Sequence, residues 1–178
     1  MLEIRKALLT DIPALLELIN AYATKGVMLP RTEFEMAENI RDFLVAFDAG
    51  RLVGCGALHF YTATSGEVRS LAVDPTLKTK GIGRALVEAL EEEARAQDLH
   101  SLFAFTYVAG FFGKLGFEEV DRGELPLKAW KDCLRCPKFQ ACDEIAVLKR
   151  LKADAPSHTI ARLTQIMDFP QFPVVRKN

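Results

Sequence analysis

The stretch SLAVDPTLKTKGIGRALVEAL, residues 70–90, is the feature that most constrains the fold. An apolar run stops at Asp74-Pro75, a basic loop follows, and a helical pattern begins after Gly81 and Gly83. Glycines beside a helix start let the backbone approach a ligand closely, and the first amides of a helix have no partner within it. The pattern predicts a strand, a loop and a helix in that order. The loop is either a structural turn or a phosphate site.

The rest of the chain extends this unit into a mixed α/β domain. Strands are predicted at residues 2–7, 43–47, 52–62, 66–74, 101–107, 117–121 and 144–150. Helices are predicted at residues 10–23 with Thr10 as the cap, at 32–40 where Thr32 and Glu35 form a capping box, from the glycines to about Gln97, and at 108–116. This order gives an antiparallel first half and a helical crossover in the second.

The composition fits one globular domain without a membrane or nucleic-acid partner. The 178 residues are 49% hydrophobic and 26% charged, and the formal net charge is −1. No apolar run is long enough to span a bilayer and no signal peptide is evident, so we expect a cytoplasmic protein. We expect the domain to cover residues 1–152. Residues 153–178 are expected to form an extension that packs on the domain or on a neighbouring subunit, which makes a homodimer possible.

Two motifs resemble the GNAT acyltransferases. The strand ending LAVDP, followed by Lys78, Gly81 and Gly83, resembles the family's acetyl-CoA motif [Q/R]-x-x-G-x-[G/A], with Lys in place of Gln or Arg, and FFGKLGF resembles its second block. The resemblance implies a GNAT fold: a mixed, mostly antiparallel central sheet, helices on both faces, and a splayed strand pair that binds acetyl-CoA. The residues it implies for acetyl-CoA are Leu71, Ala72, Val73, Lys78, Thr79, Lys80, Gly81, Ile82, Gly83, Arg84 and Phe112.

A narrower resemblance concerns the acceptor. The segments VMLPRT, EVRSLAV and ELPLKAWKDCLRCPKFQACDEIAV look like the short amino-acid N-acetyltransferases of arginine biosynthesis, of the N-acetylglutamate synthase type. This implies acetyl transfer to the α-amine of L-glutamate by direct attack on the thioester. No amino-acid-kinase domain precedes these motifs, so we expect no feedback control by that route. Another acceptor (glutamine, a peptide or a small amine) and a non-catalytic coenzyme A sensor remain as alternatives.

Acetyl transfer needs a base for the ammonium and an acid for the leaving thiolate. Glu67 is the candidate base, and strand alternation places it on one face with Arg69, Leu71 and Val73; the alternative is a solvent-facing carboxylate. The family's usual acid is a tyrosine where this chain has Phe112. Tyr107 is the candidate replacement. It is alternatively a core aromatic, and the thiolate can also leave without a side-chain acid.

A dicarboxylate acceptor calls for cations, and arginine suits carboxylates best. The candidates are Arg31 in the loop between the first two helices, Arg69 on the central strand and Lys128 in the segment LPLKAW. An arginine in an otherwise apolar strand is costly unless paired, so Arg69 is either functional or held in an ion pair. Structural or surface salt bridges are the alternative for all three residues.

Three cysteines form the pattern C-x2-C-x5-C at Cys133, Cys136 and Cys142. Three thiolates can hold zinc with a fourth ligand, but the second C-x2-C pair of the common zinc motifs is missing. A cytosolic chain keeps its thiols reduced. We therefore expect packed thiols and no metal; a structural zinc site and a facultative disulfide are the alternatives.

Overall fold

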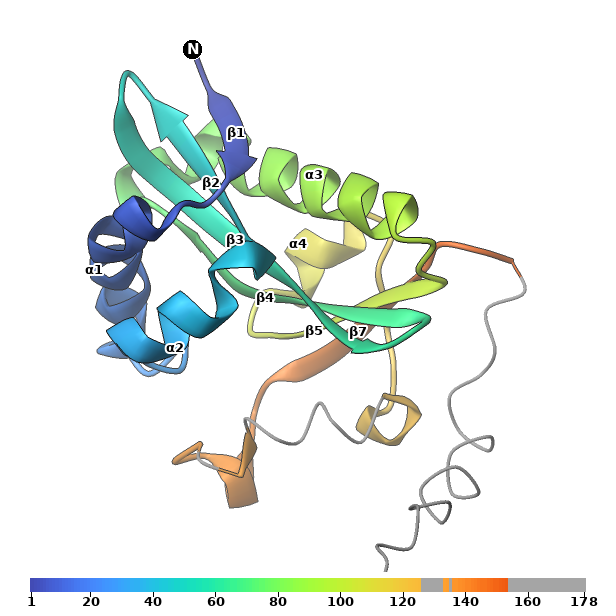
Figure 1. The fold of residues 1–178 in the computed structure, drawn as a ribbon. Helices are drawn as coiled ribbons and strands as arrows, with labels where there is room; N and C mark the ends of the chain where they lie inside the picture. Colours follow the sequence, from blue (N-terminus) through green and yellow to red (C-terminus); the bar gives the residue numbers. More distant parts are fainter. Residues whose placement is uncertain (126–132, 135, 154–178) are drawn as a thin grey trace, which may run out of the picture.

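The computed structural model describes residues 1–125, 133–134 and 136–153, without the side chains of residues 78–80 and 139. The strands are β1 (Glu3–Lys6), β2 (Phe43–Asp48), β3 (Arg51–Thr62), β4 (Ser65–Val73), β5 (Ser101–Thr106), β6 (Glu118–Glu119) and β7 (Ile145–Arg150). The α-helices are α1 (Ile12–Ala23), α2 (Glu33–Asn39), α3 (Ile82–Ala96) and α4 (Ala109–Gly113). Figure 1 shows the four helices arranged around one twisted sheet.

The order of these elements is the one that the sequence predicts. Their strands form a seven-stranded sheet in the order β1-β2-β3-β4-β5-β7-β6. Only β4 and β5 pair in parallel, and α3 makes the crossover between them. The fold is the mixed, mostly antiparallel α/β architecture expected of a GNAT protein. Residues 154–178, the expected extension, lie outside the described residues.

Local sequence signals account for most of the boundaries. Thr32 caps α2 and forms the expected capping box with Glu35. The tight turn between β2 and β3 places Ala49 and Gly50 at φ 49° and 76°, the left-handed region that suits a two-residue hairpin. Two helix boundaries differ from the prediction. α1 begins at Ile12 with Asp11 as its N-cap, because a 3-10 turn at Leu9–Asp11 precedes it. α4 spans Ala109–Gly113 and does not extend over residues 108–116, because the chain already forms a turn before Gly116, which has φ 83°.

The core has two layers, one on each face of the sheet. On one face, α3 buries Leu86, Val87 and Leu90 against the sheet, and Phe112 of α4 joins the same cluster. On the other face, Leu15 and Ile19 of α1 pack with Met36 of α2. Figure 1 shows α3 on one side of the strands and the α1–α2 pair on the other. Helices therefore cover both faces, as expected. Within the described ranges, no helix is long and apolar enough to cross a bilayer.

The parallel pair at the centre separates after three residues. β4 and β5 pair from Ser65–Ser101 to Glu67–Phe103, and no pairing is recorded beyond Glu67 on these two described strands. β4 continues to Val73 and β5 to Thr106. The sheet thus opens between residues 68–73 and 104–106, which is the expected splayed strand pair.

A bulge in β4 changes which side chains share a face. Cys55 pairs with Ala72 and Ala57 with Arg69, so β4 has one residue more than β3 in this interval. Ser70 has φ 52°, an uncommon value for a residue other than glycine. Leu71 and Val73 therefore pack with α3, while Ala72 packs with α1. The prediction that Glu67 and Arg69 share a face with Leu71 and Val73 is wrong, because the bulge inverts the alternation.

Candidate active site

The opening between β4 and β5 belongs to a cavity of about 680 Å³. One part of its wall comes from the start of α3 and from α4, and another from the loop after α1 and from residues 133–144. β4 lies between these two parts. Of the predicted site residues, the cavity wall includes Arg31, Glu67, Arg69, Leu71, Val73, Gly81, Gly83, Arg84, Tyr107 and Phe112.

The glycine loop forms the end of the cavity at α3. A 3-10 helix, Pro75–Lys80, ends at Gly81, which has φ 77° and serves as the N-cap of α3. A β-carbon at position 83 would lie 3.4 Å from the Phe111 ring and 3.6 Å from Val73, so a larger side chain would fill this end. Helix N-termini present unpaired amides and a positive dipole, which together bind phosphate. This end therefore suits an anion such as a pyrophosphate.

Some predicted donor-site residues do not line the cavity, and the side chains of others lie outside what is described. Ala72 and Ile82 are 2% and 3% exposed, and their side chains pack in the core on opposite faces of the sheet. The side chains of Lys78, Thr79 and Lys80 are outside the described part of the structure. Phe112 is 3% exposed and contacts Phe117 edge to face. A phenyl ring cannot donate a proton, so position 112 offers no acid.

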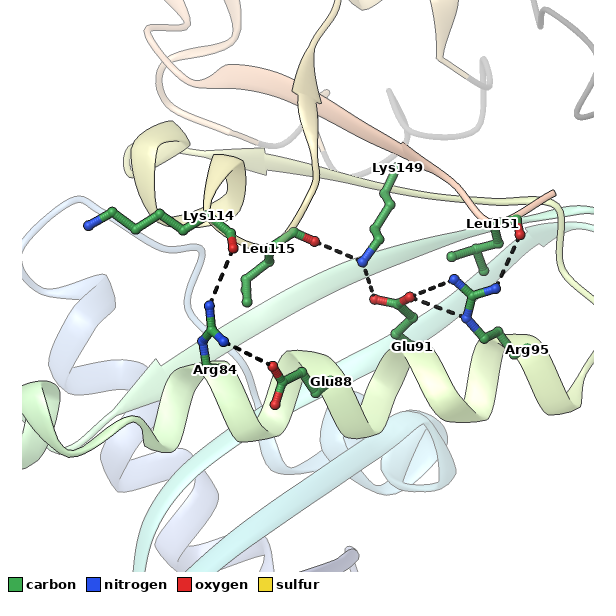
Figure 2. Close-up of polar contacts among 8 residues, drawn as sticks. All are labelled: Arg84, Glu88, Glu91, Arg95, Lys114, Leu115, Lys149 and Leu151. Atoms are coloured by element: carbon green, nitrogen blue, oxygen red, sulfur yellow. Dashed lines mark hydrogen bonds and ion pairs between the residues drawn. The ribbon is translucent and has the colours of Figure 1, made fainter. Parts of the chain in front are cut away.

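Arg84 joins the start of α3 to α4. Its guanidinium donates to the Lys114 carbonyl at 3.3 Å and lies 3.5 Å from the Glu88 carboxylate. Further along α3, Lys149 of β7 donates to Glu91 and to the Leu115 carbonyl, and Figure 2 shows these contacts in one row along the helix. The Arg84 side chain thus holds the helix start in place at the cavity wall.

Glu67 and Arg69 lie on the α1–α2 face of β4, next to the opening. Glu67 is only 8% exposed, so the alternative of a solvent-facing carboxylate is excluded. The Arg69 side chain is 11% exposed, donates to Asn39 at 3.2 Å and lies 3.6 Å from the Asp42 carboxylate. Asp42 also lies 2.6 Å from Nδ1 of His59. Arg69 is therefore held in an ion pair, one of the two roles that the sequence left open.

Two residues that sequence patterns do not single out support the bulge. The Tyr22 hydroxyl on α1 donates to the Val73 carbonyl at 2.6 Å. The buried Cys55 thiol lies 3.5 Å from the Ser70 carbonyl, and burial raises the pKa of Cys55 to about 12. A thiol with this pKa stays neutral, so Cys55 is a packing residue. In the sequence, Tyr22 is distinguished only by its place on the apolar face of the first predicted helix.

Arg31 is positioned by its backbone. The Asn20 side chain on α1 accepts a hydrogen bond from the Arg31 amide at 2.9 Å and donates one to the Arg31 carbonyl at 3.0 Å. These two hydrogen bonds with the Asn20 side-chain amide fix the backbone of the loop at Arg31. Arg31 therefore lies where α1, the loop and the cavity meet. Lys128, the third predicted acceptor cation, lies outside the described residues.

Tyr107 follows β5 directly and is 36% exposed in the cavity wall. Its hydroxyl accepts a hydrogen bond from Lys138 Nζ at 3.1 Å, and the same ammonium lies 4.8 Å from the ring centroid. Lys138 also contacts both carboxylate oxygens of Asp143 at 3.2 Å. Tyr107 is therefore not a core aromatic with its hydroxyl tied to the backbone.

The cysteine segment forms part of the same wall. Cys133, Cys136 and Cys142 all line the cavity and form no disulfide. Burial first, with nearby thiols and carboxylates, raises the pKa of Cys133 to about 11. Among the described residues, no group of three histidine, cysteine or acidic side chains is arranged to hold a metal ion. Burial also raises the pKa of Glu144, which lines the cavity beside Cys142. In the sequence, Glu144 is distinguished only by its place at the start of the strand predicted at residues 144–150.

Comparisons with known proteins agree with this geometry. The acetyltransferase (GNAT) family model matches residues 12–117. An uncharacterized N-acetyltransferase of Chlorobaculum tepidum is 43% identical over 148 residues, which are 83% of this chain and 96% of that protein. An amino-acid acetyltransferase of Mycobacterium tuberculosis is 37% identical over 121 residues, 66% of this chain and 69% of that protein.

Solved structures give the same result. The N-acetylglutamate synthase of Neisseria gonorrhoeae, complexed with coenzyme A and N-acetyl-glutamate, matches with a TM-score of 0.78 and 29% identity. The match covers 85% of this chain and 35% of that one, so this chain spans about a third of the synthase. A Mycobacterium tuberculosis protein in complex with CoA matches with a TM-score of 0.73 and 30% identity, covering 84% of this chain and 99% of that one. The chain therefore belongs to the acetyltransferase (GNAT) family and is an acyltransferase that uses acetyl-CoA.

Proposed function

We propose that this protein transfers acetyl from acetyl-CoA to the α-amine of an amino acid, and that the amino acid is L-glutamate, as in arginine biosynthesis. The relatives named amino-acid acetyltransferase and the synthase complexed with N-acetyl-glutamate support this acceptor class. Described residues of this chain line a cavity in which a donor and an acceptor can meet.

The charge of the cavity wall is the observation that carries the proposal. Its charged residues are five basic ones, Arg31, Arg69, Arg84, Arg122 and Lys138, and two acidic ones, Glu67 and Glu144. Acetyl-CoA and a dicarboxylic amino acid are both anions, and a basic wall favours them. A polyamine or an aminoglycoside is a polycation and would meet an unfavourable field. The charge therefore selects an anionic acceptor over a cationic one.

The donor is proposed to lie along the opening. Backbone amides at Thr79–Arg84 would hold the pyrophosphate, and the pantetheine would run between β4 and β5 in place of the missing strand pairing. A backbone N–H near Leu71–Val73 would face the thioester carbonyl and stabilise the oxyanion as it forms. Leu71, Val73 and Phe112 supply an apolar wall for this part of the donor.

The reaction is proposed to proceed by direct attack. Glu67 takes a proton from the acceptor ammonium, directly or through water, and the free amine attacks the thioester carbon. The C–N bond forms and the C–S bond breaks; the nitrogen, positively charged after the attack, loses its second proton to water, and the coenzyme A thiolate takes a proton from Tyr107. Glu67 suits the first step because its carboxylate is buried in the cavity wall beside the opening, where the amine would lie.

Arg31 is the proposed carboxylate ligand of the acceptor. It lines the cavity on a loop held at its backbone by Asn20, so its guanidinium starts from a fixed point. Arg69 also lines the cavity, but Asp42 and Asn39 already hold it. We assign Arg69 to shaping the acceptor wall, with Arg31 making the first contact. Lys128 remains a sequence prediction.

The experiment is thiol release from acetyl-CoA by the purified full chain, measured with each of the twenty amino acids, with spermidine and with a peptide. The proposal expects L-glutamate to give the highest kcat/KM and N-acetyl-L-glutamate to be identified by mass spectrometry. Preferred turnover of glutamine would keep the reaction and correct the acceptor. Turnover confined to spermidine or to the peptide would contradict the proposal, as would coenzyme A binding without turnover of any amine.

A further inference from the structure

Tyr107 and the bulge of β4 come from the two strands that border the opening. β4 and β5 run in parallel, and their last recorded pair is Glu67 with Phe103. Beyond this pair the strands separate; Ser70 and Leu71 form the bulge of β4, and Tyr107 directly follows the end of β5. All three residues line the cavity. The thioester would lie in this part of the cavity.

Lys138 is bound to Tyr107 in two ways. Its ammonium donates to the phenol oxygen at 3.1 Å and stands 4.8 Å from the ring centroid. An ammonium has only donors, so the phenol oxygen is the acceptor in this bond. Such a contact is stronger to a phenolate than to a neutral phenol, because the acceptor then carries a charge.

Asp143 holds Lys138 in this position. Both of its carboxylate oxygens lie 3.2 Å from the ammonium. The hydrogen bonds that Lys138 donates to Tyr107 and Asp143 raise the pKa of Lys138, so the ammonium stays charged. Lys138 comes from the segment between Cys136 and Cys142, and Asp143 stands just before β7. The cysteine segment thereby brings a cation to the end of β5.

The surroundings keep Tyr107 protonated until it is needed. Burial is the largest influence and raises its pKa, the Lys138 hydrogen bond lowers it, and Asp143 and Glu144 raise it. The net pKa lies above the ordinary phenol value of 10.0. The other described ionisable groups on this wall are the Arg122 guanidinium, which donates to the carbonyls of Cys142 and Glu144, and the thiols of Cys133, Cys136 and Cys142. A neutral phenol at physiological pH is the form that a general acid requires.

We propose that Lys138, held by Asp143, is a positioning residue that makes Tyr107 the acid for the coenzyme A thiolate. As the C–S bond breaks, the sulfur takes the phenol proton, and the phenolate that remains lies against the Lys138 ammonium. Tyr107 is partly exposed, so water reaches it and protonates the phenolate again. This inference rests on the proposed acetyl transfer and adds a device that replaces the tyrosine missing at position 112.

The main test is a double-mutant cycle of Tyr107→Phe and Lys138→Met, with Lys138→Arg and the matched control Lys152→Met. Lys152 is ion-paired to Asp98 at 2.6 Å and does not line the cavity. We expect Y107F and K138M each to lower kcat by at least about tenfold, with unchanged KM values. The double variant should equal Y107F, K138R should retain most activity, and K152M should match the wild type.

Two results would overturn the inference. One is a double variant whose loss is the product of the single losses, because the two residues would then act independently. The other is a K138M variant with normal kcat and a raised KM for the amino acid, because Lys138 would then bind the acceptor. Thermal unfolding of each variant checks that the fold is intact.

A titration separates this inference from the proposed function. Phenolate absorbance of the wild type, Y107F and K138M can be followed with rising pH, without any turnover. The comparison of the wild type with Y107F identifies the signal of Tyr107. In K138M this signal should titrate about one pH unit higher than in the wild type, because the cation that favours the phenolate is gone. An unchanged titration overturns the inference. Absence of acetyl transfer to any amino acid in the wild type would instead overturn the proposed function.

Discussion

Glu67 and Arg69 are two charged residues on one strand face for which we propose different roles. Both lie on the α1–α2 side of β4 and both line the cavity. Arg69 is held by Asn39 and Asp42, which suits a role in shaping the wall. Glu67 is nearly buried at the last pair before the strands separate, where its carboxylate can receive a proton from a bound amine.

Glu67→Gln should lower kcat by about 10²–10⁴, because the amide keeps the shape of the side chain but cannot accept the proton. The KM for acetyl-CoA should stay within twofold of the wild-type value. The defect should shrink at high pH, where the amine is already neutral. Steady-state rates across pH check this, with the exposed Glu119→Gln on β6 as the control. A kcat near the wild-type value would remove Glu67 from the reaction.

Arg31→Ala should raise the KM for the amino acid by about ten- to a hundredfold, the loss expected for one charged hydrogen bond. The KM for acetyl-CoA should change far less, because the donor end lies at α3. Arg150→Ala is the control, since Arg150 pairs with Glu118 on the outer strands. Equal effects on both KM values, or none on either, would place Arg31 outside the acceptor site.

The sequence could identify which residues of β4 are candidates for the site, but not toward which face of the sheet all of their side chains point. Alternation along β4 identified Glu67 and Arg69 as one set, which holds. Alternation also placed Leu71 and Val73 on the same face, but the bulge at Ser70 turns these two side chains to the other face. A serine at φ 52° gives no sequence signal, because this conformation usually selects glycine or asparagine. Tertiary contacts from Tyr22 and Cys55 support the bulge, and they join elements far apart in the sequence.

At the scale of elements, the opening between β4 and β5 and the start of α3 form one unit. The strands separate at Glu67, and α3 begins at Ile82 with Gly83 facing Phe111 of α4. The sequence predicted every strand and helix in order, because periodicity and caps are local. It could not predict where the pairing ends, because that depends on backbone geometry and not on residue type.

Gly83→Val should raise the KM for acetyl-CoA by at least about tenfold, because the added methyl groups would meet Phe111 and Val73 at the donor end. The fold should persist, since position 83 is helical and needs no positive φ. Gly110→Ala is the control, because a β-carbon there meets nothing within 4 Å. An unchanged KM for acetyl-CoA in G83V would contradict the assignment of this loop to the donor.

The contacts between α3 and β7 in Figure 2 predict a pH-dependent stability. Burial alone would raise the pKa of Glu91, but hydrogen bonds from Lys149 and Arg95 outweigh it and lower the pKa below 4.5. A depressed folded pKa stabilises the fold above the unfolded value, and this stabilisation is lost as pH falls through the folded pKa. Glu91 therefore stabilises the protein at neutral pH and not in acid.

Glu91→Gln should lower the free energy of unfolding by about 1–3 kcal/mol at pH 7, and the difference from the wild type should shrink below about pH 4.5. Urea unfolding at several pH values measures it. Glu88→Gln on the same helix should cost less than about 0.5 kcal/mol, because Glu88 makes an exposed pair. A difference that stays constant with pH would show that the Glu91 charge does not act through these bonds.

At the scale of the whole molecule, the site is where segments distant in the chain meet. The loop after α1, β4, the start of α3, the end of β5 and residues 133–144 all line one cavity. The motif at residues 70–90 identified the donor from sequence, because one continuous segment makes that end. The Lys138–Tyr107 contact could not be predicted, because it joins residues 31 positions apart through the path of the cysteine segment.

The proposed direct attack requires donor and acceptor to be bound in the cavity together. The most direct test is an initial-rate matrix with acetyl-CoA and L-glutamate both varied, with N-acetyl-L-glutamate quantified by mass spectrometry. Direct attack predicts intersecting double-reciprocal lines and no acetylated protein when acetyl-CoA is mixed with the enzyme alone. Parallel lines, with acetyl carried on a cysteine of the cavity wall, would contradict the account, as would the absence of N-acetyl-L-glutamate.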